Sequence, residues 1–342
     1  MNDVKYILVT GGAGYIGSHT VVKLYNNGYC PVIVDDFRNS HVSVIEGLEK
    51  ITGEKIIYRK IDVCDYTSFE KVFIEFSFVG IIHFAAYKAV GESVQSPLKY
   101  YKNNLTALIN CLELAEQYHV ENIVFSSSCT VYGEPKGVKI VTEQSEIQKA
   151  SSPYGNTKQI GEEIIDDLIK SGSSLKILKL RYFNPVGAHE TGLIGELPIG
   201  KPNNLLPFVT QTGIGKLEGL TVFGNDYSTP DGTCVRDFIH VCDLADAHVK
   251  SIDWLEKQEE SLTEAVNIGT GKGTSVLEII HTFEKVSELT LNWKFGSRRE
   301  GDVQEIIADA DKSSKLLNWK PTKTVKDAIF DAWNWELKLN ND

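Results

Sequence analysis

The stretch TGGAGYIG, residues 10–17, comes directly after a short apolar run and directly before a segment with helical periodicity. Its glycines at positions 11, 14 and 17 allow a tight turn, close approach of backbone amides to a pyrophosphate, and close packing of a helix on a strand. The amino end of the helix adds unpaired N–H groups and a positive dipole end. The stretch therefore predicts the phosphate-binding turn of a dinucleotide site, with a purely structural glycine-rich turn as the alternative.

Acidic residues follow at the distance that a dinucleotide site requires. Asp35 ends the second apolar run, where a carboxylate can accept hydrogen bonds from ribose hydroxyls. Together with Asp36 it would repel a 2′-phosphate, which favours NAD over NADP, although the nearby Arg38 weakens this inference. Asp62 and Val63, after the third apolar run, suit contacts to the adenine ring.

The first half of the chain alternates apolar runs with amphipathic segments. The strand-like runs are rich in Ile, Val and Phe and span 6–10, 31–35, 56–59, 80–85, 122–127 and 175–181. The helix-like segments between them span 15–27, 42–51, 68–76, 97–118 and 154–171. Continuously apolar strands separated by helices predict a parallel sheet covered on both faces, which is a doubly wound α/β (Rossmann) fold.

The alternation of apolar runs and amphipathic segments ends after about residue 185, where Gly and Pro become frequent. We expect a dinucleotide-binding Rossmann domain over 1–185 and a smaller C-terminal α/β domain, mainly for substrate binding, over 186–342. Segments near 238–270 have apolar runs that could return to pack on the first domain.

Composition narrows the class of protein. The 342 residues contain 35 Lys plus Arg against 46 Asp plus Glu, a net charge of −11, which argues against a nucleic-acid partner. Six cysteines without a CxxC pair predict reduced thiols, with neither a metal site nor a disulfide framework. No apolar run reaches signal-peptide or transmembrane length, so we expect a cytoplasmic protein without a membrane partner.

Residues capable of chemistry follow the fourth and fifth predicted strands, at 84–88 and 126–129. Tyr154 and Lys158 stand at i and i+4 at the start of a helix, shortly after a serine cluster at 126–128. An ammonium beside a phenol favours the phenolate and lowers the tyrosine pKa, so that the phenolate can take a hydroxyl proton while a hydride leaves the same carbon for NAD. Alone, such a pair is commonly a helix surface pair. Behind a dinucleotide fold we interpret it as catalytic.

Several stretches together carry a resemblance that covers nearly the whole chain. They are TGGAGYIGSH (10–19), KAVGES (88–93), SSSCTVYG (126–133), RYFNPVGA (181–188), PNNLLP (202–207), FGND (223–226), VRDFIH (235–240) and RREGD (298–302). By these the sequence resembles the extended short-chain dehydrogenase/reductase superfamily and, more closely, the UDP-glucose 4-epimerase (UDP-galactose 4-epimerase) family.

The resemblance implies a role for each matching residue. Tyr154 would be the acid/base at the sugar 4-hydroxyl, Lys158 would hold the NAD ribose and lower the phenol pKa, and Ser128 would polarise the hydroxyl. The implied cofactor-binding residues are Gly11, Gly14, Tyr15, Ile16, Gly17, Asp35, Asn39, Ser40, Asp62, Val63, Phe84, Ala85, Lys88, Asn104, Ser126, Tyr154, Lys158 and Tyr182. The implied substrate-binding residues are Lys88, Ser128, Tyr154, Asn184, Asn204, Leu205, Thr221, Phe223, Arg236, Arg299, Asp302 and Ile306.

The implied reaction is a closed redox cycle that interconverts UDP-glucose and UDP-galactose. Oxidation at C4 gives a 4-ketopyranose, which turns over in the pocket and receives the hydride on its other face. NAD is not consumed and is expected to stay tightly bound. The resemblance also implies a homodimer through the helices at 97–118 and 154–171.

Four positions depart from the family pattern. Cys129 and Ala86 replace a usual alanine and glycine, and Tyr87 stands where an aliphatic residue is common. Ile306 stands at the gate beside the sugar 2-substituent, where a tyrosine excludes N-acetyl sugars and a small residue admits them. Since isoleucine is intermediate, we expect UDP-glucose and UDP-galactose as the main pair and leave UDP-N-acetylglucosamine and UDP-N-acetylgalactosamine open as a second pair.

Three other functions would use part of the same sequence pattern. A sugar-nucleotide 4,6-dehydratase starts with the same oxidation but needs an Asp-Glu pair in the serine loop, where this chain has Cys129-Thr130. A non-enzymatic dinucleotide-sensing protein would be expected to lose the Ser, Tyr or Lys, and all three are present. A net dehydrogenase with exchanging NAD is the third alternative.

Overall fold

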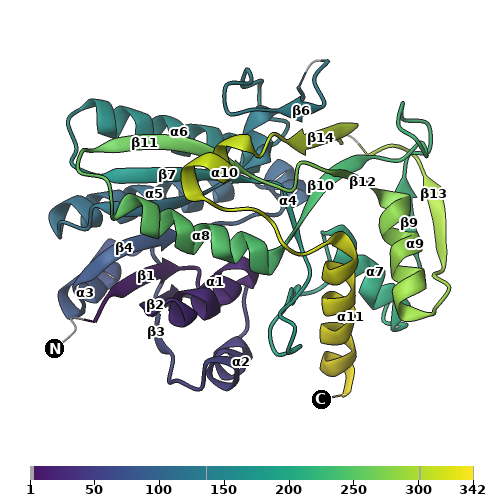
Figure 1. The fold of residues 1–342 in the computed structure, drawn as a ribbon, viewed down its shortest axis with the longest axis horizontal. Helices are drawn as coiled ribbons and strands as arrows, with labels where there is room; N and C mark the ends of the chain where they lie inside the picture. Colours follow the sequence, from purple (N-terminus) through teal and green to yellow (C-terminus); the bar gives the residue numbers. More distant parts are fainter. Residues whose placement is uncertain (1–3, 136, 300–301, 342) are drawn as a thin grey trace.

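The computed structural model describes residues 4–135, 137–299 and 302–341, so that Glu300 and Gly301 of the RREGD stretch lie outside the described residues. Seven parallel strands form the main sheet in the order β11-β7-β5-β4-β1-β2-β3 (Figure 1). Their bounds are β1 Tyr6–Thr10, β2 Cys30–Asp35, β3 Ile57–Lys60, β4 Phe78–His83, β5 Asn122–Ser128, β7 Lys176–Tyr182 and β11 Leu262–Ile268. The predicted doubly wound α/β fold is confirmed.

Both faces of this sheet are covered by helices. Ile7 and Val9 of β1 pack in one apolar cluster with residues of α1 (Tyr15–Asn26), α2 (Ser43–Thr52) and α8 (Val241–Leu255). Leu8 between them packs on the opposite face with residues of α3 (Tyr66–Glu75), α5 (Pro97–Gln117) and α6 (Pro153–Lys170). Because successive strand residues point to opposite faces, a strand buried on both faces must be apolar throughout.

The rest of the chain builds a second group of elements beside the carboxyl edge of the sheet. Strands β12, β10, β14 and β6 pair in that order, β8 pairs with β10, and β13 pairs with β9. Their bounds are β6 Ile140–Val141, β8 Asn184–Val186, β9 Leu220–Phe223, β10 Val235–His240, β12 Gly273–Ser275, β13 Trp293–Gly296 and β14 Glu305–Ala308. The remaining elements are α4 Val90–Gln95, the 3₁₀ turn η1 Cys129–Tyr132, α7 Leu205–Gly213, α9 Val276–Ser287, α10 Asp311–Leu317 and α11 Val325–Asn341.

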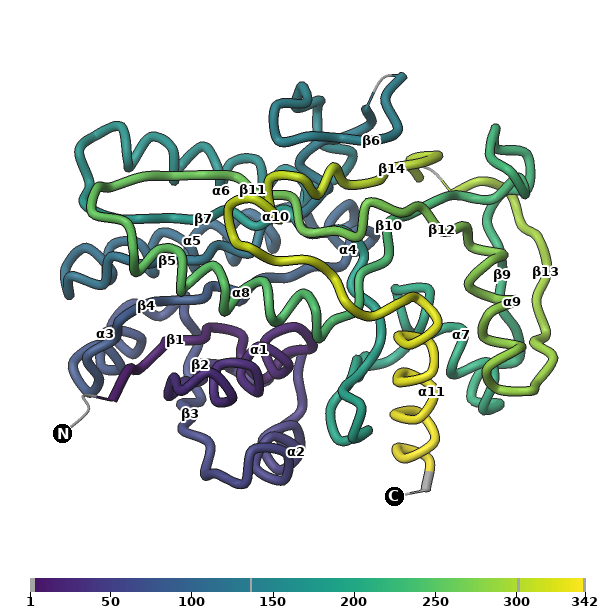
Figure 2. Tube along the Cα trace, viewed as in Figure 1, coloured from purple at the N-terminus to yellow at the C-terminus, as the bar shows by residue number. Residues whose placement is uncertain are grey.

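The chain crosses between the two groups more than once. Figure 2 shows the trace running from β10 through α8 into β11, which lies at the edge of the main sheet. There β11 pairs with β7 in parallel, from Leu262 opposite Lys176 to Ile268 opposite Tyr182. The segment 238–270 therefore contributes a strand and a helix to the first group, while the domain division near residue 185 stays a prediction.

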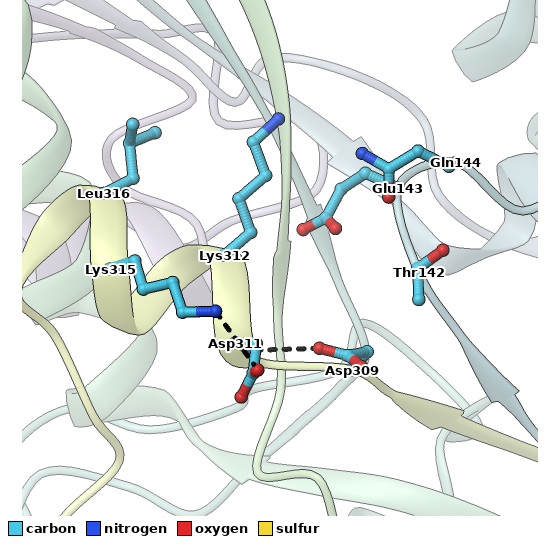
Figure 3. Close-up of a pocket in the computed structure, with 8 residues that line it drawn as sticks. All are labelled: Thr142, Glu143, Gln144, Asp309, Asp311, Lys312, Lys315 and Leu316. Atoms are coloured by element: carbon cyan, nitrogen blue, oxygen red, sulfur yellow. Dashed lines mark hydrogen bonds and ion pairs between the residues drawn. The ribbon is translucent and has the colours of Figure 1, made fainter.

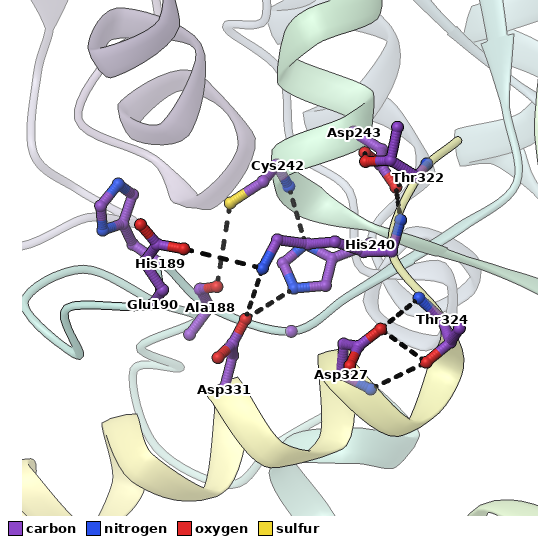
Figure 4. Close-up of polar contacts among 12 residues, drawn as sticks. Ala188, His189, Glu190, His240, Cys242, Asp243, Thr322, Thr324, Asp327 and Asp331 are labelled. Atoms are coloured by element: carbon purple, nitrogen blue, oxygen red, sulfur yellow. Dashed lines mark hydrogen bonds and ion pairs between the residues drawn. The ribbon is translucent and has the colours of Figure 1, made fainter. Parts of the chain in front are cut away.

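The helix α11 is fixed by a polar cluster at the start of α8 (Figure 4). His240 accepts the Cys242 amide at Nδ1, 3.0 Å away, so its Nε2 carries the proton and donates to Asp331 of α11 at 3.0 Å. Lys323 also reaches Asp331, at 3.1 Å. On the adjoining loop, the Tyr15 hydroxyl donates to the Gly187 carbonyl at 2.7 Å. The cluster thus connects α11 to the loop at Gly187, which Tyr15 contacts from the start of α1.

None of the helices in the part of the chain that the structure describes combines the length and the apolar character needed to cross a membrane.

Candidate active site

The glycine turn between β1 and α1 has the shape that a pyrophosphate requires. Gly11 has a φ of +68°, and a Cβ there would lie 2.9 Å from the Ala85 amide nitrogen. A Cβ on Gly17 would lie 2.4 Å from the Gly11 carbonyl oxygen. Gly14 stands at the N-cap of α1 without a side-chain acceptor for the first helical amides. Amides left without a side-chain cap beside a turn that excludes side chains fit a bound dinucleotide phosphate.

Asp35, the last residue of β2, lies where a dinucleotide site requires a carboxylate. Asp35 accepts the Ala13 amide at 3.1 Å, the Phe37 amide at 2.9 Å and the Ser40 hydroxyl at 2.9 Å, which holds its carboxylate beside the turn. Burial nevertheless raises the pKa of Asp35 above its usual value. Asn39 lies exposed on the same loop.

Arg38, which weakened the preference for NAD, is neutralised by its neighbours. Its Nε lies 2.5 Å from an Asp36 oxygen, and one Nη pairs with Asp62. With two carboxylates around it, Arg38 offers no unpaired charge to a 2′-phosphate, so the geometry supports NAD more strongly than the sequence did.

The loop after β4 borders the turn from the other side. Phe84 donates its amide to the Thr10 carbonyl at 3.0 Å, which fixes the loop to β1. Asn104 of α5, predicted to lie along the cofactor, is buried and bonds within the protein instead: it accepts the Tyr87 amide at 2.8 Å and donates to Thr157 at 3.1 Å. These bonds support a positioning role for Asn104.

The three predicted catalytic residues come together at the carboxyl edge of the sheet. Ser128 ends β5, and Tyr154 and Lys158 lie on the first turns of α6, whose N-cap Ser152 accepts the Gly155 amide at 3.1 Å. The Lys158 ammonium donates to the Ser126 carbonyl at 2.5 Å and lies 6.0 Å from the Tyr154 ring centre.

The expected lowering of the tyrosine pKa is not what the ligand-free geometry gives. Burial raises the pKa of Tyr154 to about 12, although hydrogen bonding to Ser128 lowers it. Burial also lowers the pKa of Lys158 to about 8, while the Glu162 charge acts in the opposite direction. The i, i+4 rule placed the pair on one face, but it could not show how strongly desolvation acts there, and desolvation is the largest cause of both pKa shifts.

Ser126 and Tyr182 lie directly beside this pair. Their hydroxyls hydrogen-bond to each other, and burial raises the pKa of Tyr182 above its usual value. Tyr182 ends β7, and Ser126 lies two residues before the end of the neighbouring strand β5, where it stands opposite Leu180.

A buried ion pair beneath the catalytic helix was missed in the sequence. Glu162, one turn after Lys158, pairs with Arg181 of β7 at 2.6 Å, and both side chains are 5% exposed. The Ser127 hydroxyl donates to Glu162 at 2.5 Å, and Arg181 donates to the Tyr132 hydroxyl at 3.2 Å. The available signal was a strand predicted to be buried that carries charged residues, Arg181 among them, because a charged residue is rarely buried without a partner.

One side of the predicted sugar-nucleotide site is built on a shared carboxylate. Glu196 accepts from Lys88 at 3.2 Å and from Asn204 at 2.6 Å. Asn204 is the N-cap of α7, and Leu205 is the first residue of that helix. Asn184 lies on β8 opposite Phe238 of β10. The structure therefore brings Lys88 and Asn204 together.

The other side holds five more of the predicted substrate-binding residues, Thr221, Phe223, Arg236, Arg299 and Asp302. Asp302 lies 2.7 Å from Arg299 and 3.9 Å from Arg236, so one carboxylate orients both guanidinium groups. The Arg299 guanidinium lies 5.7 Å from the centre of the Phe223 ring on β9, the strand that also carries Thr221. Two guanidinium groups beside an aromatic ring suit a nucleoside diphosphate.

Ile306 lies opposite Arg236 in the β10–β14 pairing. It is buried in a small apolar cluster with Phe183 and Val131, against which Cys129 packs. Ile306 therefore adjoins the serine loop, and its role as a gate stays a prediction.

A surface pocket of about 430 Å³ lies elsewhere, between the segment after β6 and α10 (Figure 3). Its lining residues are Thr142, Glu143, Gln144, Asp309, Asp311, Lys312, Lys315 and Leu316, a set that contains none of the predicted site residues. Asp311 and Lys315 pair with each other at 3.4 Å. In the described ranges, no three His, Cys, Asp or Glu side chains group closely enough to hold a metal ion.

Comparison with known proteins identifies the family of this chain. The family model described as GDP-mannose 4,6 dehydratase matches residues 8–331. UDP-glucose 4-epimerase 2 of Arabidopsis thaliana is 48% identical over 97% of this chain and 95% of its own length. UDP-glucose 4-epimerase of Bacillus subtilis is 48% identical over 96% of each chain. The crystal structure of UDP-glucose 4-epimerase from Bifidobacterium longum in complex with NAD+ and UDP is 44% identical and superposes with a TM-score of 0.94 over 98% of this chain and 99% of that chain. The chain therefore belongs to the UDP-glucose 4-epimerase family of the extended short-chain dehydrogenase/reductases.

Proposed function

We propose that this protein is an NAD-dependent isomerase that interconverts UDP-glucose and UDP-galactose by reversible oxidation at the sugar C4. The observation that carries this function is the meeting of Tyr154, Lys158 and Ser128 at the edge of the sheet that also bears the glycine turn. A base, a cation and a hydroxyl donor next to a dinucleotide site are the groups that oxidation of a secondary alcohol needs.

Each of the three catalytic residues has its own role in the reaction. Tyr154 takes the proton from the sugar O4 and returns it when the 4-keto group is reduced on its other face. Lys158 stabilises the phenolate with its positive charge while the Ser126 carbonyl fixes its position. Ser128 hydrogen-bonds O4, and bound NAD supplies the reversible hydride acceptor for C4.

The residues proposed for the nucleotide are supported by their charge and geometry. Arg236 and Arg299 would bind the diphosphate, because a guanidinium fork matches phosphate oxygens. Asp302 would release part of its contact with Arg299 to meet the uridine ribose. Thr221 and Phe223 on β9 would border the uracil.

The serine loop argues against elimination chemistry. The family model carries the name of a 4,6-dehydratase, but the residues after Ser128 are Cys129 and Thr130, neither of which has a carboxyl group. Burial raises the pKa of the Cys129 thiol to about 11, which disfavours the thiolate that an additional base would need. Epimerisation needs no such base.

The direct test is to incubate the purified protein with UDP-galactose and no added NAD, and to follow UDP-glucose by chromatography. We expect conversion, because NAD is regenerated within each cycle. Protein that stays inactive after NAD is supplied would overturn the function. Release of NADH into solution during turnover would instead indicate a net dehydrogenase.

The protein is further proposed to be a cytoplasmic homodimer that pairs through α5 and α6. The exposed apolar residues Leu98 on α5 and Val94 on the preceding α4, which are 81% and 60% exposed, support this surface. Light scattering should give a dimer for the wild type and a monomer for Leu98→Glu. Ile74→Glu, at a 69% exposed position on α3, is the matched control and should leave the dimer intact. A monomeric wild type would contradict the proposal.

A further inference from the structure

Arg38 and Tyr87 join two loops that border the dinucleotide turn. Arg38 follows β2 and Tyr87 follows β4, and the Arg38 Nη1 donates to the Tyr87 hydroxyl at 3.0 Å. The guanidinium carbon lies 5.8 Å from the centre of the Tyr87 ring. The other Nη pairs with Asp62, which follows β3. One guanidinium thus links the ends of three strands.

The position of this bridge follows from the order of the strands. The sheet runs β4-β1-β2-β3, so the glycine turn that ends β1 lies between β4 and β2. A contact from the β2 and β3 loops to the β4 loop therefore spans the carboxyl end of β1. Ligands of such sheets lie beyond the carboxyl ends of the strands, and Asp35 and Asp62 assign this side to the adenosine half.

Both ends of the bridge are held by other residues. Asn104 accepts the Tyr87 amide at 2.8 Å and donates to the Tyr87 carbonyl at 3.0 Å. The Lys99 ammonium lies 4.3 Å from the centre of the Tyr87 ring. On the other loop Phe37 has a φ of 60°, a left-handed conformation that is unfavourable for a bulky residue. Bracing and strain of this kind are unusual for a chance surface contact.

We propose that the Arg38–Tyr87 bridge is a strap over the adenosine half of the bound dinucleotide, and that it slows release of the cofactor. The inference rests on the proposed function, because it presupposes that NAD lies on the glycine turn. The strap touches neither the reacting carbon nor Tyr154, so it acts on cofactor retention and leaves the chemical step unchanged. Tyr87 is thereby assigned a role that its sequence context alone did not give.

Exchange of bound NAD tests the strap. Protein that holds NAD is mixed with excess isotopically labelled NAD, and label retained after rapid desalting is measured over time. Loss of a hydrogen bond to a charged group should make exchange in Tyr87→Phe about ten-fold faster. Arg38→Met should exchange at least as fast, and Tyr87→Phe combined with Arg38→Met should be no faster than Arg38→Met alone.

Two matched controls separate the strap from general surface effects. Arg59→Met removes an arginine that pairs with Glu75 and lies 5.4 Å from the Phe76 ring, a similar arrangement away from the site. Tyr66→Phe removes a hydroxyl that donates to Gln117 at 2.9 Å. Both controls should exchange NAD at the wild-type rate.

The outcomes are distinguishable. Wild-type protein that neither holds nor takes up NAD would overturn the proposed function together with the strap. Wild-type protein that holds NAD while Tyr87→Phe exchanges at the same rate would overturn the strap alone. A lowered Tm of nucleotide-free Tyr87→Phe with unchanged exchange would likewise overturn it, because the bridge would then be only structural.

Discussion

The Lys158 ammonium lies 6.0 Å from the centre of the Tyr154 ring, and Lys158 is buried while Tyr154 is half-buried. Burial raises the pKa of the phenol to about 12 and lowers the pKa of the ammonium to about 8. Each group is therefore held in a site that disfavours its own charged form. Transfer of the proton from substrate to Tyr154 becomes favourable only when further charge or hydrogen bonds, from bound cofactor and sugar, complete the site.

Tyr154→Phe should lower kcat for UDP-galactose by about a thousand-fold, because the proton acceptor is lost. Ser128→Ala should lower it by about ten-fold or more, since the sugar hydroxyl loses a hydrogen-bond donor. Coupled detection of UDP-glucose measures both effects. Tyr66→Phe is the control for a tyrosine outside the site. Full activity of Tyr154→Phe would remove Tyr154 from the mechanism.

Lys158→Met should abolish turnover and yet stabilise nucleotide-free protein at pH 7 by up to about 3 kcal/mol. The lysine pKa falls from its ordinary 10.5 to about 8 on folding, so burial of the ammonium has its full cost below pH 8. That cost disappears as the pH rises from 8 through 10.5, and the advantage of the variant should disappear with it. Urea unfolding across this range measures the difference. Lys170→Met, at a 74% exposed position, should show no such trend.

Glu162→Gln should destabilise the protein by about 3 to 5 kcal/mol, because it leaves Arg181 buried without a counter-charge. Denaturant unfolding measures the loss. Glu75→Gln, which removes the partner of the exposed Arg59, provides the surface comparison and should unfold at the wild-type denaturant concentration. An equal change in the free energy of unfolding of the two variants would mean that water reaches the Glu162–Arg181 pair.

Ile306→Tyr should suppress turnover of UDP-N-acetylgalactosamine at least ten-fold more than turnover of UDP-galactose. The larger side chain would extend from the cluster beside Cys129 toward the sugar 2-substituent. Parallel assays with both substrates give the ratio, and Ile306→Val should leave that ratio near the wild-type value. An equal loss on both substrates would point to overpacking of the buried cluster instead.

The sequence was informative about the fold where the signal is local. The strands β1 and β2 lie within a residue of their predicted ranges, because a buried parallel strand is apolar throughout. The short elements β6, β8 and α4 escaped prediction, since two to six residues carry too little periodicity. The amphipathic helix α11 was also missed, although Ile329 and Trp333 mark its buried face.

For the site, motif residues were easier to predict than their surroundings. The meeting of Tyr154, Lys158 and Ser128 followed from motifs at known strand ends. The Asn104 bonds to Tyr87 and Thr157 join α5, the β4 loop and α6, and no spacing along the chain indicates such a contact. The pKa directions could not be predicted either, because they depend on burial by residues distant in sequence.

The bond between His240 and Asp331 has a consequence for how the protein is made. Tyr15 is translated early, and its hydroxyl donates to the carbonyl of Gly187. Gly187 lies against His240, whose partner Asp331 is translated much later. A nascent chain that ends before Asp331 can form β1 and the glycine turn, yet its His240 still lacks the carboxylate that fixes it. We therefore expect the loop at Gly187 to become fixed only after α11 has been synthesised.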